Sequence, residues 1–245
     1  IGLSLVGSEM CIRDRNGSGA IGSSIIKGLN DKSVNLIITS STGDDVHNKK
    51  TMHWKYSGSD SVGSLFESIK NEYSQLDSVV NCLGSIFLKP AHLTSEQDFD
   101  DILDINLKSS FLILKNSVPM MRKNGGNLLF FSSAASSIGM ANHEAISAAK
   151  GGIEAMVRSA AATYAKNNIK VNAIAPGLVD SNLSKNIVSN EAALNMSKRM
   201  HSVGRIGTPD DISKFAIPLI VDNSSWVTGS IINIDGGLST TKIAS

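Results

Sequence analysis

Three side chains, Ser133, His143 and Lys150, have types and spacing suited to proton transfer. Ser133 follows a short apolar run, and Lys150 lies in an alanine-rich segment that predicts a helix. Residues 143 and 150 share one face of such a helix, because a spacing of seven residues is about two turns. An imidazole can move protons near neutral pH. Lysine desolvates badly, so a lysine facing the end of a buried strand suggests a function.

A glycine-rich stretch near the start of the chain could bind a dinucleotide. Gly17, Gly19 and Gly22 match the pattern G-x-G-x-x-G and precede an expected helix over 23–29. Such glycines let backbone amides approach a pyrophosphate at a helix N-terminus. A plain strand-to-helix turn is the alternative, because many Gly/Ser turns match the same pattern.

The end of the next expected strand, 34–39, bears on the choice of cofactor. Dinucleotide folds place there an Asp or Glu that holds the ribose hydroxyl of NAD, or an Arg that accommodates the phosphate of NADP. This chain has Ser40, Ser41 and Thr42 instead. The missing carboxylate favours NADP over NAD, and the alternative is that these residues are simply loop hydroxyls.

Hydrophobic periodicity predicts the elements that position these residues. The apolar run 128–131 is bounded by glycines and serines, so it predicts a short buried strand. Further strands are expected at 34–39, 76–81, 170–175 and 231–234, an edge strand at 53–56, and helices at 62–73, 95–123 and from Thr208 onward. The alternation predicts an α/β fold, a single doubly wound parallel sheet (Rossmann-like) flanked by helices on both faces.

The long expected helix, 95–123, contains an asparagine at an unusual place. Thr94 and Gln97 predict a capping box at the start of this helix. Asn106 lies in its middle, where the side chain competes for backbone hydrogen bonds. A functional role for Asn106 is therefore favoured over a simple helix irregularity.

Composition excludes several classes of function. The net charge is +1 over 245 residues, with no charge block that would favour nucleic acid. No apolar run approaches the roughly 20 residues of a membrane-spanning helix. The two cysteines have no metal-binding spacing and suggest no disulfide framework. We expect a cytoplasmic protein that acts on a small molecule and holds no metal.

The first residues of the chain fit this fold poorly. Arg13, Asp14 and Arg15 precede the glycines, whereas a central parallel strand should stay apolar up to its turn. The run 6–15 also resembles translated sequencing-adapter read-through. We expect residues 1–15 to be non-native, with the genuine first strand lost, and residues 16–245 to form one domain. A divergent first strand is the alternative.

Together, Ser133, Lys150 and the run VNAIAPG at 171–177 resemble the short-chain dehydrogenase/reductase family. The resemblance implies that Ser133 positions a substrate oxygen and that Lys150 holds the nicotinamide ribose. It implies that Asn106 anchors a water linked to this lysine, and that a tyrosine four residues before the lysine transfers the proton. This chain has Ile146 at the tyrosine position, and isoleucine cannot transfer a proton.

His143 is the candidate replacement for the missing tyrosine. A branch of the superfamily, the enoyl-thioester reductases, places its tyrosine seven residues before the lysine, and His143 has that spacing. The alternative is that His143 only caps or packs at the helix start. Glu144 is a weaker candidate on a different face of the helix, and water is the other source of the proton.

The resemblance also implies a set of cofactor contacts and an assembly. The contacts lie in the glycine-rich turn, at strand ends and before the lid: Gly17, Gly19, Ile21, Gly22, Ser40, Ser41, Asn81, Gly84, Lys150, Pro176, Gly177, Val179 and Ser181. The segment 184–203 is expected to form a helical lid that selects the substrate. Analogy with relatives implies a homodimer or homotetramer built on the last strand and helix.

Two functions remain open from the sequence. The first is NAD(P)(H)-dependent oxidoreduction, with hydride transfer between nicotinamide and a small carbonyl, alcohol or enoyl substrate. The second is a catalytically inactive NAD(P)-binding scaffold or sensor on the same fold. Ile146 favours the second, whereas the joint presence of Ser133, Asn106 and Lys150 favours the first.

Overall fold

A parallel sheet forms the centre of the computed structural model, which describes residues 3–9, 19–29, 34–40, 51–221 and 226–242. The strand order is β3-β2-β1-β4-β5-β6-β7, and each neighbouring pair is parallel. The strands are β1 (Leu3–Glu9), β2 (Val34–Ser40), β3 (Thr51–His53), β4 (Ser78–Asn81), β5 (Gly126–Phe131), β6 (Ile169–Pro176) and β7 (Ile231–Ile234). The predicted parallel sheet is therefore confirmed.

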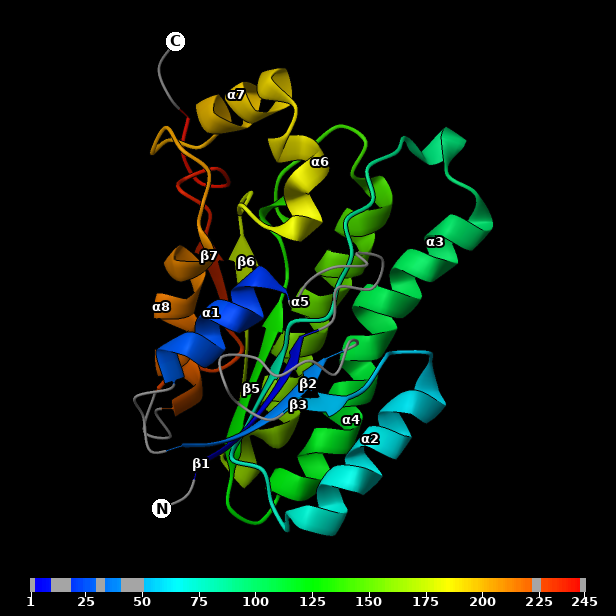
Figure 1. The fold of residues 1–245 in the computed structure, drawn as a ribbon, viewed down its shortest axis with the longest axis vertical. Helices are drawn as coiled ribbons and strands as arrows, with labels where there is room; N and C mark the ends of the chain where they lie inside the picture. Colours follow the sequence, from blue (N-terminus) through cyan, green and yellow to red (C-terminus); the bar gives the residue numbers. More distant parts are fainter. Residues whose placement is uncertain (1–2, 10–18, 30–33, 41–50, 222–225, 243–245) are drawn as a thin grey trace.

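Helices cover both faces of this sheet, as Figure 1 shows. The long helices are α1 (Ala20–Leu29), α2 (Ser59–Glu72), α3 (Glu96–Leu103), α4 (Ser109–Met121), α5 (Glu144–Tyr164) and α8 (Pro209–Val221). Apolar residues of α1 and α8, such as Ile25 and Ile212, pack with Leu129 on one face of the sheet. Those of α2, α4 and α5 form a second cluster on the other face. The doubly wound arrangement is thus confirmed.

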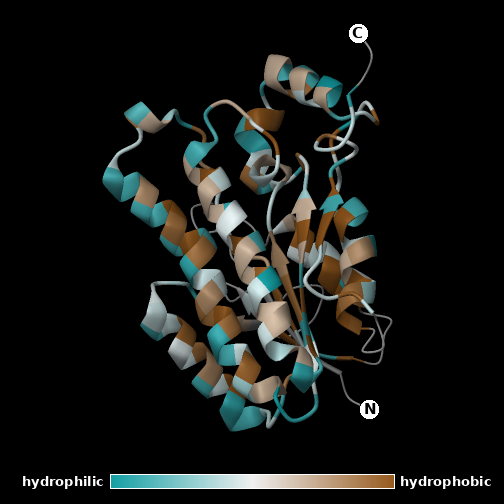
Figure 2. Cartoon of the chain, turned by 180° about the vertical axis from the view of Figure 1, so that it is seen from behind, coloured by the Kyte–Doolittle hydropathy of each residue, from teal (hydrophilic) through white to brown (hydrophobic). Residues whose placement is uncertain are grey.

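Strand β5 shows why the centre of the sheet is so apolar. All six of its residues are buried, as expected for a parallel strand with helices on both of its faces. Figure 2 shows the same pattern, with hydrophobic colour along the strands and alternating colours on the helices. The chain leaves β5 at Ser132 and Ser133, at the carboxyl end of the strand.

Shorter segments lie beyond the carboxyl ends of β6 and β7, where Figure 1 shows α6 and α7. These helices agree with the helical structure expected over 184–203, and their role as a lid stays a prediction. The short segments of the chain are η1 (Ala91–Leu93), the π-helix η2 (Asp104–Lys108), η3 (Ala134–Ser136), η4 (Ala165–Asn167), η5 (Asn182–Ser184), α6 (Lys185–Val188) and α7 (Glu191–Met200).

A strand stands at the place of the first strand of the sheet. Leu3–Glu9 forms β1 in the middle of the sheet, and Leu5 pairs with Leu36 on one side and Ser78 on the other. The charges at 13–15 lie outside the described residues. The non-native origin of residues 1–15, with the genuine first strand lost or scrambled, stays a prediction.

The helix expected over 95–123 is not continuous. It begins with Ser95 as the N-cap, whose hydroxyl accepts from the Asp98 amide at 3.1 Å, so the capping box predicted from Thr94 is wrong. The Thr94 hydroxyl instead donates to the Pro90 carbonyl at 3.0 Å. The π-helix η2 then separates α3 from α4 and contains Asn106. The irregularity therefore coincides with the asparagine that the sequence singled out.

Candidate active site

Lys150 lies at the centre of the candidate site, on α5 beside the carboxyl end of β5. Its side chain is buried, and its Nζ donates to the Phe131 carbonyl at 3.0 Å. Burial lowers the pKa of the Lys150 ammonium from 10.5 to about 8, and the nearby Cys82 thiol acts in the opposite direction. A lysine with a pKa near neutral can hold or release a proton at working pH.

Asn106 and Gly84 meet Lys150 at the same place. A Cβ on Gly84 would lie 3.2 Å from Lys150 Nζ and 3.1 Å from Asn106 Oδ1, so a larger residue here would have to move these groups by a few tenths of an ångström. Asn106 is completely buried; its Oδ1 accepts from the Ser85 amide at 3.1 Å, and its Nδ2 donates to Ser85 Oγ and the Ile102 carbonyl, each at 3.0 Å. The asparagine thus joins the π-helix to the chain after β4.

Ser133 begins the turn that follows β5. Its Oγ accepts from the Ala135 amide at 3.2 Å, so the turn orients the side chain while the hydroxyl proton remains available to a substrate oxygen. The Ser147 hydroxyl of α5 donates to the Ala135 carbonyl at 2.8 Å. The helix that carries Lys150 therefore also fixes the turn that carries Ser133.

Ile146 and His143 have different surroundings at the start of α5. Ile146 is buried in an apolar cluster with Ile102 of α3 and Ala149. His143 is half-buried at the N-cap position, its ring makes no capping bond, and its Nδ1 lies 2.7 Å from the Ala141 carbonyl. Since a carbonyl only accepts, Nδ1 carries a proton, and Nε2 of the neutral ring has the lone pair.

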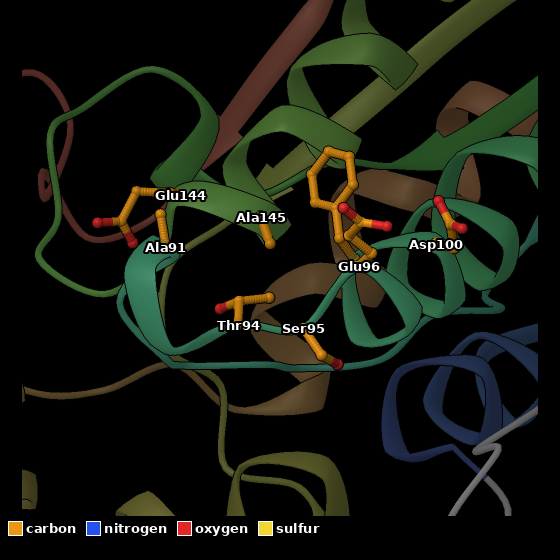
Figure 3. Close-up of a pocket in the computed structure, with 8 residues that line it drawn as sticks. Ala91, Thr94, Ser95, Glu96, Asp100, Glu144 and Ala145 are labelled. Atoms are coloured by element: carbon orange, nitrogen blue, oxygen red, sulfur yellow. The ribbon is translucent and has the colours of Figure 1, made fainter.

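Glu144, the weaker proton-transfer candidate, faces another cavity. This cavity lies between the chain around η1 and α3 and the start of α5, and its lining includes Glu96, Asp100 and Glu144. Figure 3 shows Glu144 beside Ala91, with Glu96 and Asp100 across the hollow. None of the predicted catalytic residues lines this cavity.

The start of α1 fits the pyrophosphate of a dinucleotide. Gly22 is buried and Ile21 half-buried in the first turn of the helix. A Cβ on Gly19 would meet nothing within 4 Å, so the space before the helix is open, and the first amides of a helix have no acceptor within it. β1 leads into this region and lies between β2 and β4, where the strand order reverses and such folds bind their ligands.

Three other predicted cofactor contacts, Gly17, Ser40 and Ser41, lie at or beyond the edge of the described residues near the start of α1. Gly17 and Ser41 lie outside the described residues, and Ser40 is the last residue of β2. Asn81 ends β4, and its Nδ2 donates to the Ser110 hydroxyl of α4 at 3.0 Å while its Oδ1 accepts from the Leu83 amide. These bonds agree with a structural role for Asn81.

The turn after β6 supplies the remaining predicted contacts, starting at Pro176 and Gly177. Val179 forms an isolated parallel β-bridge with Gly207. The hydrogen bonds of this bridge come from the two neighbours of Val179: the Leu178 carbonyl accepts from the Gly207 amide, and the Asp180 amide donates to the Gly207 carbonyl. The N–H of Val179 therefore points away from Gly207. The Ser181 hydroxyl is engaged in a capping box with Ser184.

Comparison with known proteins decides the family. The model of a family described as Enoyl-(Acyl carrier protein) reductase matches residues 21–239. A 3-oxoacyl-acyl-carrier-protein reductase of Thermotoga maritima is 31% identical over 182 residues, which are 73% of this chain and 72% of that protein. The chain belongs to the short-chain dehydrogenase/reductase family of NAD(P)-dependent oxidoreductases.

A further relative of this short-chain dehydrogenase/reductase and a solved structure of similar fold extend the comparison. A tropinone reductase homolog of Arabidopsis thaliana is 30% identical over 181 residues, which are 74% of this chain but only 54% of that protein. The structure of the aldohexose dehydrogenase of Thermoplasma acidophilum superposes with a TM-score of 0.87 and 22% identity, over 99% of this chain and 96% of that one. This likeness confirms the fold. In the part of the chain that the structure describes, no helix is long and apolar enough to cross a membrane.

Sequence reasoning missed several residues around the site of this dehydrogenase/reductase. The Glu154 carboxylate accepts from the Ser132 hydroxyl at 2.7 Å and also from the Ser136 hydroxyl. His201, 2% exposed, accepts from the Leu178 amide at 3.2 Å. The spacing from Lys150 to Glu154 is one helical turn, so helix periodicity combined with the serine-rich turn could have indicated the first of these contacts.

Proposed function

We propose that the protein reduces a small ketone, or oxidises the corresponding alcohol, with NADP(H) or NAD(H). The bound nicotinamide supplies or accepts the hydride, and the residues described above orient the substrate and move the proton. Support comes from two relatives named as a 3-oxoacyl-acyl-carrier-protein reductase and a tropinone reductase homolog, both names that refer to ketone reduction. An enoyl thioester is the other substrate class to test, because of the description of the family model.

One observation carries this proposal, namely that Lys150, Asn106 and Gly84 lie together beside the chain that leads to Ser133. Lys150 Nζ and Asn106 Oδ1 both border Gly84, at the end of β4. Lys150 also bonds the carbonyl of Phe131, directly before the serine turn. In this arrangement Ser133 would donate to the substrate oxygen, and Lys150 would hold the nicotinamide ribose with Asn106 as its neighbour.

His143 is our candidate for the proton transfer. Its bond to the Ala141 carbonyl leaves Nε2 as the basic nitrogen of the neutral ring. Its position at the N-cap places it two turns before Lys150 on α5. In oxidation, Nε2 of the neutral ring would accept the proton of the alcohol. In reduction, the ring protonated at both nitrogens would give its Nε2 proton to the oxygen as the hydride arrives at carbon, and water would restore that proton afterwards.

A specific observation favours the second candidate function, an inactive NAD(P)-binding protein. Ile146 is 5% exposed and packs against α3, so the position of the family tyrosine is part of the core. A site that keeps its lysine and asparagine but fills this position with an isoleucine could bind the dinucleotide without turnover.

Oxidation of NADPH and NADH, measured against ketones, quinones and enoyl thioesters, separates the two functions. The full chain would be compared with His143→Ala and Ile146→Tyr. Turnover that is lost in His143→Ala supports the relocated proton donor. Cofactor binding without turnover, together with turnover gained in Ile146→Tyr, supports the inactive protein and contradicts the role of His143.

The finer choice of cofactor and the assembly also belong to this proposal. The lack of a carboxylate at Ser40 and Ser41 supports NADP, and the ratio of the dissociation constants of NADPH and NADH would test this preference. Trp226 is fully exposed before β7, and Phe215 on α8 is 58% exposed. These two exposed apolar side chains support a homodimer or homotetramer, and sedimentation equilibrium would test the assembly. A cytoplasmic location is also part of this proposal.

A further inference from the structure

A carboxylate lies behind the serine turn and has no part in the mechanism given above. Glu154 is on α5, and its side chain is only 13% exposed. Its Oε1 accepts the Ser132 hydroxyl at 2.7 Å and also accepts the Ser136 hydroxyl. A carboxylate with so little exposure needs such partners, because burial of an unpaired charge is costly.

The two hydroxyl groups flank Ser133, one residue before it and three residues after it. Ser136 Oγ also lies 2.6 Å from the Ser133 carbonyl, and Ser132 Oγ lies 3.3 Å from the Lys150 carbonyl. Each hydroxyl has one proton, and the charged acceptor forms the stronger bond. Glu154 therefore accepts hydrogen bonds from both ends of the turn and holds the turn against α5.

The same helix carries Lys150, one turn before Glu154. A shift of the turn relative to α5 would change the position of Ser133 relative to Lys150. The orientation of Ser133 depends on this turn, because its Oγ accepts from the Ala135 amide inside it. Displacements of about 1 Å between reacting groups can lower a rate by about 100-fold.

We propose that Glu154 is a positioning residue that fixes the Ser133 turn relative to Lys150 by accepting the hydroxyl protons of Ser132 and Ser136. This inference rests on the proposed function, since it assigns a catalytic role to Ser133. Glu154 acts through the two serines and does not need to touch substrate or cofactor.

The test compares Glu154→Gln with Glu154→Leu in the full chain. Glutamine keeps a side-chain oxygen as acceptor, whereas leucine has none. Arg158→Leu is the matched control on α5, because it removes the 3.9 Å ion pair of Glu154 but leaves the hydroxyl bonds. Amide hydrogen exchange is read at Ser136 and Ser137, whose N–H groups bond to Ser133 and Ala134 within the turn.

We expect Glu154→Leu to speed the exchange of these two amides at least about tenfold and to lower kcat about 10- to 100-fold. The dissociation constant of NADPH should stay within about twofold, since the turn contributes no predicted cofactor contact. Glu154→Gln and Arg158→Leu should keep exchange and kcat within about threefold of the parent chain.

Unchanged exchange of the turn in Glu154→Leu would overturn the inference, whatever the activity. If the parent chain shows no turnover with any substrate, the proposed function fails, while the exchange comparison still decides the role of Glu154. If Glu154→Leu does not fold, the double variant Ser132→Ala, Ser136→Ala removes the same bonds with a smaller change in shape. Slow exchange in that variant would then overturn the inference.

Discussion

Two turns present residues to the same edge of the sheet, but different chemical groups hold them. The turn after β5 carries Ser133 and is held by the Glu154 carboxylate on α5. The turn after β6 contains Gly177 and Leu178 and is held by the imidazole of His201, the residue after α7. The first turn is thus bound to a core helix, and the second to the expected lid.

The imidazole has a well-defined protonation in this arrangement. Its Nδ1 lies 2.6 Å from the Ser197 carbonyl and must donate, so Nε2 is the acceptor for the Leu178 amide. A Cβ on Gly177 would lie 2.5 Å from Nε2, so glycine is required for this close approach. Of the charged groups around it, Arg205 pairs with Asp211, and Asp235 accepts from the Gly237 amide.

The comparison teaches what each turn requires of the group that holds it. Glu154 only has to accept, and both of its partners in the turn are hydroxyl groups. His201 has to donate at Nδ1 and accept at Nε2 at the same time. We therefore expect the lid side of the site to depend on a side chain that can do both, and the serine side on an acceptor alone.

The largest expected effect comes from Lys150→Met. This change removes the hydrogen bond from Lys150 Nζ to the Phe131 carbonyl, which holds the chain just before the Ser133 turn. We expect kcat to fall at least about 100-fold, with a smaller change in cofactor affinity. Steady-state kinetics with both cofactors would measure this loss. A variant that keeps more than about a tenth of the parent kcat would contradict the assigned role of Lys150.

The same variant should be more stable than the parent chain at neutral pH. Burial lowers the pKa of Lys150 from 10.5 to about 8, so below pH 8 the folded protein bears the full cost of the buried ammonium. This cost is about 3 kcal/mol and disappears as the pH rises from 8 to 10.5. Urea unfolding across this range should show a stability advantage of Lys150→Met that shrinks with pH, and a constant advantage would contradict the assigned burial.

The next effect tests the lid side of the comparison through His201→Leu. This change leaves the Leu178 amide without its partner, at a cost of about 2 kcal/mol, while the Ser197 carbonyl keeps its bond from the backbone amide of residue 201. We expect KM to rise about tenfold with a smaller change in kcat. Thermal unfolding and substrate titration would measure both effects. His201→Gln, which can donate and accept at once, is the control and should stay near the parent chain.

The smallest expected effect is that of Ser147→Ala. This change removes one neutral bond to the Ala135 carbonyl and costs about 1 kcal/mol. Because Glu154 still holds the turn, kcat should fall no more than about threefold. A loss as large as that of Glu154→Leu would show that the hydroxyl of Ser147, and not the carboxylate, fixes the turn.

Local patterns were sufficient to predict much of the fold and part of the site. The buried strand before Ser133 followed from a short apolar run bounded by glycines and serines. The cost of burying a lysine singled out Lys150, and the structure places its ammonium where that strand ends. Asn106 was singled out as a poor mid-helix residue, and it lies in the π-helix.

Long-range contacts account for what remained hidden. The bond between Glu154 and Ser132 joins residues from different elements, and no local pattern specifies which serine a glutamate will meet. The contact between His201 and Leu178 depends on how the lid returns to the sheet. The N-cap of α3 is Ser95 and not Thr94. The two hydroxyl residues are adjacent, and no local pattern decides which of them caps the helix.

The π-helix at Asp104–Lys108 has a consequence for insertions and deletions in the gene. A π-turn accommodates one residue more than the α-helix it interrupts, so loss of one codon here could restore a regular helix and keep the faces on both sides. Loss of one codon within α3 or α4 would instead rotate all that follows by about 100°. Before the turn, α3 packs on α5, and after it α4 packs on α2. This segment should therefore accept substitutions at exposed positions such as Lys108, and loss of one codon should disturb the packing less here than within α3 or α4.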